Sequence, residues 1–214
     1  MPDETKIKTL LLVGGEIHDW RGVGDVLEPM LKRTGTFDVT RVDNDLGAFG
    51  AKRIAPYELV VFYWTLGTLN DARRGGLLDH IAQGKGFVGL HSAADSFRGD
   101  RAWHTFIGGH FITHPRYRRY QVSVIPRRGP ITAGIEEFMI TDEQYILEYD
   151  AGLNVLANAL WKGRLMPVLW TKRFKQGRVF YSALGHDPKA CKQAMFKKTF
   201  LRGCLWAAGR DVED

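Results

Sequence analysis

A short apolar run bounded by glycine is the feature that most constrains the fold of this 214-residue chain. Residues 87–90 (FVGL) follow Gly86 and end abruptly at His91, after which small residues follow. Such a run is typical of a strand buried on both faces, and the small residues permit a tight turn into a helix. His91 then stands at the carboxyl end of the strand. In an open α/β sheet, this end lines the crevice where ligands bind.

Segments with strand and helix patterns alternate along the first half of the chain. The predicted elements are residues 8–13 (strand), 21–34 (helix), 37–42 (strand), 59–63 (strand), 70–83 (helix) and 86–90 (strand). Apolar residues recur in the helical segments with a period of about 3.6, and a glycine follows each helix. This alternation predicts right-handed βαβ units and a doubly wound, mostly parallel sheet.

The second half of the chain has a different pattern. The expected elements are residues 100–107 (helix), 110–115 (loop), 119–125 (strand), 155–161 (strand), 166–171 (strand), 178–183 (strand) and 189–208 (helix). Glycine-containing turns separate the last three strands, which predicts an antiparallel extension of the sheet. Pro115 argues against a helix in the segment before it, so we expect a loop there. No linker-like stretch interrupts the chain, and we expect one domain over residues 1–214.

Composition narrows the classes of function. With 44% hydrophobic and 25% charged residues, the chain resembles a globular protein rather than a disordered one or a coiled coil. Its apolar runs are too short for a signal peptide or a membrane span, so we expect a cytoplasmic protein without a membrane partner. The net charge of +6 is compatible with binding to nucleic acid, because basic surfaces attract phosphate groups. Because lysine and arginine are spread along the chain, we expect no nucleic-acid partner.

Three predicted strands are each followed by a histidine, namely His18, His91 and His186. Carboxyl ends of parallel strands lie on one edge of a sheet, so these imidazoles can converge. Three neutral imidazoles are a common ligand set for Zn²⁺ and suit other divalent transition metals. Taken alone, each histidine could instead be an ordinary loop residue with a hydrogen-bonded side chain and no role in a site. Acidic residues that can complete or orient such a site are Glu16, Asp19, Asp95, Glu143 and Asp187.

A second group of histidines lies in the segment HTFIGGHFITHP. His110 and His114 are expected to cover the site as loop residues, and His104 is either a packed residue or a functional one. Elsewhere, His80 is expected at the surface or edge of its helix. Cys191 and Cys204 fall in the one predicted closing helix, about 20 Å apart, which is too far for a disulfide.

The motifs, taken in order, resemble one known family. GGEIHDW, GKGFVGLHSAADS, WHTFIGGHFITHP, DEQY, MPVLW and GRVFYSALGHD together are similar to the ThuA-like, trehalose-utilisation family, from Leu11 to about Leu205. The resemblance implies membership of the class I glutamine amidotransferase-like superfamily, with a flavodoxin-like α/β core. It also implies a carbohydrate-related role, on trehalose or another disaccharide through keto-sugar intermediates, and a small-molecule carbohydrate as partner.

The comparison with amidotransferases is informative where it fails. Those enzymes carry a nucleophilic cysteine in a Gly-x-Cys-x-Gly elbow, whereas residues 89–93 here read GLHSA, with His91 at the nucleophile position. His186, followed by Asp187, resembles their catalytic histidine. A cysteine-dependent glutaminase is therefore not expected. A nucleophilic Ser92 with His186 as base stays open, although Ser92 more naturally caps the following helix.

Two hypotheses follow. In the first, a divalent metal held by His18, His91 and His186, with Glu143 or Asp187 as a further ligand or base, serves a hydrolase or isomerase of sugar derivatives. In the second, the chain is a non-catalytic sugar-binding or regulatory module. Under either hypothesis the oligomeric state is open, and a homo-oligomer is compatible with the sequence. The expected sugar-binding residues are Trp20, Trp64, Ser92, His104, His110 and Tyr145. For the aromatic residues among them, the alternative role is packing in the hydrophobic core.

Overall fold

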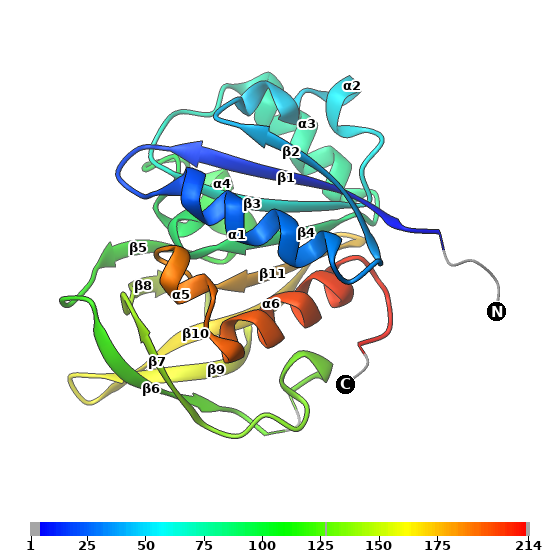
Figure 1. Ribbon diagram of the computed structural model, residues 1–214. Coiled ribbons are helices and arrows are strands. Elements are labelled where there is room, and N and C mark those ends of the chain that lie inside the picture. Colours follow the sequence, from blue (N-terminus) through cyan, green and yellow to red (C-terminus); the bar gives the residue numbers. More distant parts are fainter. Residues whose placement is uncertain (1–4, 127, 213–214) are drawn as a thin grey trace.

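The computed structural model describes residues 5–126 and 128–212. One large sheet with helices on both faces dominates the molecule (Figure 1). The strands are β1 (Ile7–Gly15), β2 (Phe37–Asp43), β3 (Leu59–Thr65), β4 (Gly86–Leu90), β5 (Gly109–Thr113), β6 (Arg118–Val124), β7 (Phe138–Asp142), β8 (Ile146–Tyr149), β9 (Asn154–Trp161), β10 (Arg164–Phe174) and β11 (Gly177–Ser182). The helices are α1 (Trp20–Lys32), α2 (Ala51–Ile54), α3 (Asp71–Ala82), α4 (Arg101–Ile107), α5 (Pro188–Cys191) and α6 (Ala194–Ala207), with short 3₁₀ helices η1 (Leu46–Phe49), η2 (His91–Asp95) and η3 (Pro130–Thr132).

The order of strands in the large sheet confirms the predicted fold class. Within the described residues, nine strands pair in the order β2-β1-β3-β4-β11-β10-β9-β6-β7. The first five are parallel to one another. The remaining strands continue the sheet in antiparallel fashion. The strand order reverses at β1, which lies between β2 and β3, and such a switch point opens a crevice at the carboxyl ends of the strands.

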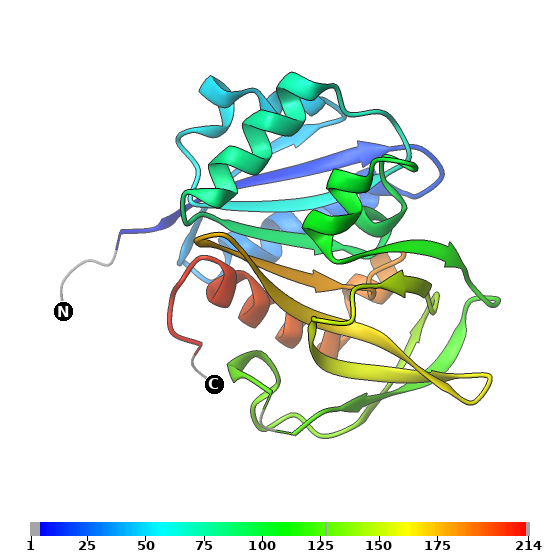
Figure 2. The ribbon, with the colours of Figure 1, turned by 180° about the vertical axis from the view of Figure 1, so that it is seen from behind.

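The two helix layers bury the centre of the sheet. α1, α5 and α6 cover one face, and α3 and α4 cover the other (Figures 1 and 2). All residues of β3 and β4 are buried, as expected for central strands between two layers. Within the described residues, no helix is long and apolar enough to cross a membrane.

Three local predictions are wrong. Residues 110–115 are not a loop, because Gly109–Thr113 form β5 and pair antiparallel with β8 in a separate two-stranded sheet. Pro115 excludes a helix but not a strand that ends before it. The closing segment contains two helices, α5 and α6, so the buried, free Cys191 and Cys204 lie in different helices. His80 is buried, with Nε2 2.8 Å from the Tyr57 carbonyl oxygen.

Two adjacent glycines of α3 give a matched test of this packing. A Cβ on Gly75 would meet nothing within 4 Å, whereas one on Gly76 would lie 2.2 Å from the Phe49 carbonyl oxygen. We expect Gly75→Ala to raise the free energy of unfolding by up to about 1 kcal/mol, from helix propensity. Gly76→Ala should lower it by about 1–3 kcal/mol, because η1 must move. Urea unfolding of both variants measures this; equal stabilisation would contradict the close contact between α3 and η1.

Candidate metal centre

Four side chains from four strand ends meet at the carboxyl edge of the sheet. His18 follows β1, His91 follows β4, Glu143 follows β7 and His186 follows β11. One potential ligand atom from each of the four lies within 4.8 Å of the others. The structure therefore brings together the three histidines singled out in the sequence, and Glu143 is the acidic residue that joins them.

His91 has a strained backbone conformation, and its side chain points toward the other ligand candidates. Its φ of +38° lies in the left-handed region, which residues other than glycine rarely adopt. The turn is held by the Tyr181 hydroxyl, which donates to the His91 carbonyl oxygen at 2.7 Å. His91 Nδ1 lies 2.8 Å from the Ala183 carbonyl oxygen. Because a carbonyl only accepts, Nδ1 donates to it, and Nε2 is the ring nitrogen that faces His186 and Glu143.

The separations between ligand atoms fit a tetrahedral ion. His186 Nδ1 lies 3.3 Å from His91 Nε2 and 3.1 Å from Glu143 Oε2. His91 Nε2 lies 3.5 Å from Glu143 Oε2. Tetrahedral zinc with ligands at about 2.0–2.2 Å separates neighbouring ligand atoms by about 3.3–3.6 Å. Two of the observed separations, 3.3 and 3.5 Å, are of this size, and the third, 3.1 Å, is slightly shorter.

The same three atoms can all act as metal ligands. His91 Nε2, His186 Nδ1 and Glu143 Oε2 lie 3.1–3.5 Å from one another. A neutral imidazole nitrogen or a carboxylate oxygen each offers a lone pair to a cation. A divalent cation would satisfy all of these atoms, so the residues fit a metal ion such as Zn²⁺.

The fourth ligand candidate, His18, is held neutral. Its Nδ1 lies 2.7 Å from Thr65 Oγ1, which leaves Nε2 for a ligand role. Burial, followed by the neighbouring His91 and His186, lowers the pKa of His18 to about 3. A neutral imidazole is the form that binds a metal.

Glu143 and His186 shift each other's pKa. Burial alone would raise the pKa of Glu143, but contacts with His186 and His91 outweigh it, and the pKa is lowered. Burial alone would lower the pKa of His186, yet Glu143 raises it overall. Glu143 is thus ionised near neutral pH, and its charge favours the protonated form of His186.

A buried carboxylate behind the site ties two of the ligand segments together. Asp142 is fully buried and accepts backbone N–H groups from Gly185 at 2.7 Å, Glu143 at 2.8 Å and His186 at 3.1 Å. Burial raises the pKa of Asp142. This carboxylate fixes the positions from which Glu143 and His186 project.

Sequence reasoning missed the supporting roles of Asp142 and Thr65, and it expected His114 over the site only as a loop residue. Asp142 and Thr65 hold the ligands from behind, and His114 Nδ1 lies 2.9 Å from Glu143 Oε1 at the outer edge. A signal existed for the first two, because Thr65 follows an apolar parallel strand and Asp142 precedes Glu143 directly. The contact of His114 depends on β5, where the sequence pattern predicts a loop.

One of the residues expected to bind sugar, Tyr145, lies at the site. The Tyr145 ring centroid is 3.8 Å from that of His91, and its hydroxyl is 3.5 Å from His18 Nε2. Ser92 is fully buried. Ser92 neither caps a helix nor faces solvent, so the geometry does not support it as a nucleophile.

The other expected site residues serve local structure instead. Asp187 caps α5, with Oδ1 accepting from the Ala190 N–H at 2.7 Å, and does not join the ligand group. Trp20 and Trp64 are only 8% and 6% exposed. Arg21 covers the ring of Trp20, and Trp64 stacks on Phe62, so protein contacts occupy both rings.

His104 and His110 form a separate pair. Their rings stack with centroids 4.4 Å apart, at α4 and β5. His110 Nε2 lies 3.6 Å from Glu148 Oε2, and both histidines line a cavity of about 220 Å³. Neither histidine belongs to the ligand group of His18, His91, Glu143 and His186.

Solved structures of other proteins share this fold. A ThuA-like protein from Parabacteroides merdae is 23% identical, with a TM-score of 0.89 over 98% of this chain and 93% of that one. A ThuA-like protein from Bacteroides uniformis is 16% identical, with a TM-score of 0.79 over 97% and 93%. A GMP synthase subunit from Thermoplasma acidophilum is 13% identical, with a TM-score of 0.58 over 96% of each chain. These likenesses concern the fold.

The sequence itself identifies the family. No curated protein matches it. The family model of ThuA, described as trehalose utilisation, matches residues 8–207. This match covers nearly the whole chain and agrees with the motifs. The protein therefore belongs to the ThuA family, and its role is related to trehalose utilisation.

Proposed function

We propose that this protein is a divalent-metal-dependent hydrolase or isomerase acting on a disaccharide or keto-sugar. The convergence of His18, His91, Glu143 and His186 carries the proposal, with separations of 3.1–3.5 Å among the ligand atoms of the last three. The family's link to trehalose utilisation supports the substrate class. A metal ion bound by these residues would polarise a sugar carbonyl or activate water.

The surrounding residues have defined roles in this proposal. Burial raises the pKa of Tyr145 well above its usual value, so its hydroxyl stays protonated and can donate a hydrogen bond beside His18. Glu143 presents Oε2 to the metal position and Oε1 to His114, whose side chain is 42% exposed. His114 thus connects Glu143 with solvent, where protons enter and leave.

An exposed aromatic ring at the rim suits a sugar. Tyr117 is 39% exposed, and its ring centroid lies 5.6 Å from that of His186. Its hydroxyl donates to the Thr141 carbonyl oxygen at 3.2 Å, which fixes the ring. An apolar ring face with a tethered hydroxyl is the kind of surface on which a pyranose stacks. We therefore assign to Tyr117 the sugar-stacking role that the sequence pattern predicts for Trp20 and Trp64.

Metal affinity should depend on pH in a direction set by His186. Its pKa lies above the ordinary 6.5, because Glu143 stabilises the protonated form. Metal binding must displace that proton. We expect a constant affinity above the raised pKa and a fall of up to about tenfold per pH unit below it. Competition titration of Zn²⁺ against an indicator between pH 8 and pH 6 measures the slope; an affinity that rises on acidification would contradict it.

Turnover of keto-sugars tests the enzymatic part of the proposal. Metal-loaded protein should convert a keto-disaccharide, and chelated protein should do so again only after Zn²⁺ or Mn²⁺ is restored. A double variant, His91→Ala with His186→Ala, should lose both metal and turnover. If that variant kept both, the proposal would fail. Sugar binding without turnover, unaffected by metal, would instead indicate the non-catalytic module.

A further inference from the structure

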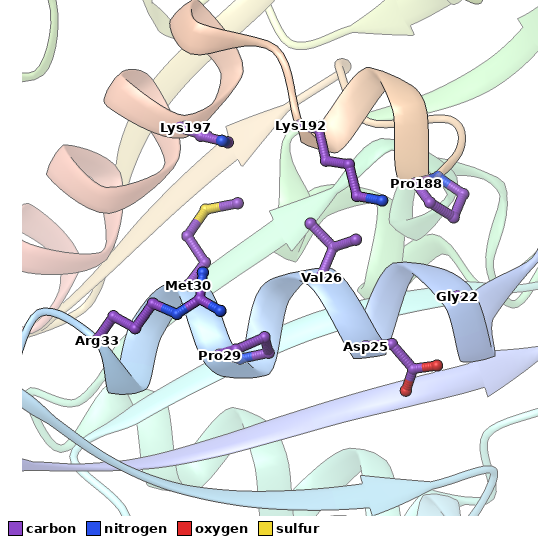
Figure 3. Close-up of a pocket in the computed structure, with 9 residues that line it drawn as sticks. All are labelled: Gly22, Asp25, Val26, Pro29, Met30, Arg33, Pro188, Lys192 and Lys197. Carbon is purple, nitrogen blue, oxygen red and sulfur yellow. The ribbon is translucent and has the colours of Figure 1, made fainter.

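A large groove lies outside the metal centre, between α1 on one side and α5 and α6 on the other (Figure 3). Its volume is about 650 Å³, within the range of small-molecule binding sites. None of the four ligand candidates lines it. The helices are kept close at one end, where a Cβ on Gly22 would lie 2.8 Å from Pro188 Cγ.

The floor of the groove is apolar. Val26 and Met30 project from α1 toward α5 and α6, as Figure 3 shows. Both are partly buried and pack against the hydrophobic core beneath them. Pro29 and Pro188 add further apolar surface at the sides. An apolar floor of this kind favours a ligand with a hydrocarbon or aromatic body.

The rim of the groove is cationic and uncompensated. Arg33, Lys192 and Lys197 line it, and none has an ion-pair partner among residues 5–126 and 128–212. Lys192 reaches into the groove toward α1 (Figure 3). The one acidic lining residue, Asp25, pairs with Arg41 at 2.7 Å and points away from the lysines.

We propose that this groove binds an amphiphilic anion, a small molecule whose apolar body lies on Val26 and Met30 and whose carboxylate or phosphate head contacts Lys192 and Lys197. An uncharged apolar ligand would leave three cations beside it without partners. An inorganic anion would leave the floor exposed to water. An apolar body joined to an anionic head satisfies both features of the groove. The groove is concave, which favours one enclosed molecule over the surface of a bilayer.

Decanoate is a suitable probe, with decanol as its uncharged counterpart. In protein labelled with ¹³C at methionine methyl groups, decanoate should shift the Met30 resonance saturably and leave Met166, on β10, unchanged. Decanol should bind at least tenfold more weakly. Vesicles of anionic lipid should cause no such saturable shift of Met30.

Two double variants with equal changes in charge provide the control. Lys192→Gln with Lys197→Gln should weaken decanoate binding at least tenfold. Lys189→Gln with Lys198→Gln changes exposed lysines of α5 and α6 that do not line the groove, and should leave affinity within about twofold. Equal weakening in both pairs, equal binding of decanol, or the absence of a Met30 shift with decanoate would each overturn the proposal.

Discussion

Replacing Asp142 with alanine should lower the free energy of unfolding by at least about 3 kcal/mol. The change leaves three backbone N–H groups, of Glu143, Gly185 and His186, without their acceptor in a largely buried place. Each such loss costs about 1–3 kcal/mol. The same change frees the segments that hold Glu143 and His186, so metal affinity should fall about 10–100-fold. Urea unfolding and a metal titration measure the two effects.

Asp142→Asn is the matched control for that variant. In the native protein, Oδ1 accepts from Glu143 and His186, and Oδ2 accepts from Gly185. An asparagine can keep the oxygen at the first position, so only the Gly185 N–H loses its acceptor. The expected loss is therefore about 1–3 kcal/mol. Equal losses in the alanine and asparagine variants would contradict the role assigned to the three hydrogen bonds.

Replacing Glu143 with glutamine should weaken metal binding by about 100-fold while the fold persists. Glu143 is the one anionic member of the ligand group, and it also raises the pKa of His186. In the variant, the pKa of His186 should fall. The pH below which affinity declines should therefore move to lower pH. Competition titrations at several pH values measure both the affinity and this shift.

Glu148→Gln controls for the change in net charge. Glu148 has a side chain that is 75% exposed, lies on β8 and is outside the ligand group. Its substitution should leave metal affinity and its pH dependence unchanged. If the Glu143→Gln protein bound metal as tightly as the native protein, with the same pH dependence, Glu143 would not be a metal ligand.

The parallel half of the sheet was predictable because its signals are local. β3 and β4 are apolar runs that are buried throughout, and glycine or a turn marks their ends. A strand pattern of this kind predicts the carboxyl edge of the sheet, and with it the histidines at that edge. For this reason His18, His91 and His186 were identifiable without a structure.

The acidic ligand could not be chosen from the sequence. Glu143 reaches the site from β7, at the far edge of the antiparallel extension, and its position depends on pairings between distant segments. Asp187, next to His186 in the sequence, was an equal candidate. In the structure its carboxylate caps α5 instead, a local hydrogen bond that competes with a role in the site.

The sequence also could not show which aromatic side chains are exposed at the site, because their burial depends on contacts between distant segments. Trp20 and Trp64 lie near the ends of predicted strands, but large rings gain most from burial, and both are covered by neighbouring side chains. Tyr117 lies just before β6, whose place beside the site follows from long-range pairing. The β5 strand was missed because its partner, β8, is distant in the sequence.

Metal content, measured by plasma mass spectrometry on untagged protein purified without chelators, tests the central claim most directly. The native protein should contain close to one divalent metal ion per chain, and a His91→Ala variant prepared in parallel should contain almost none. If neither protein held metal, even after incubation with Zn²⁺ or Mn²⁺, then His18, His91, Glu143 and His186 would not form a metal centre.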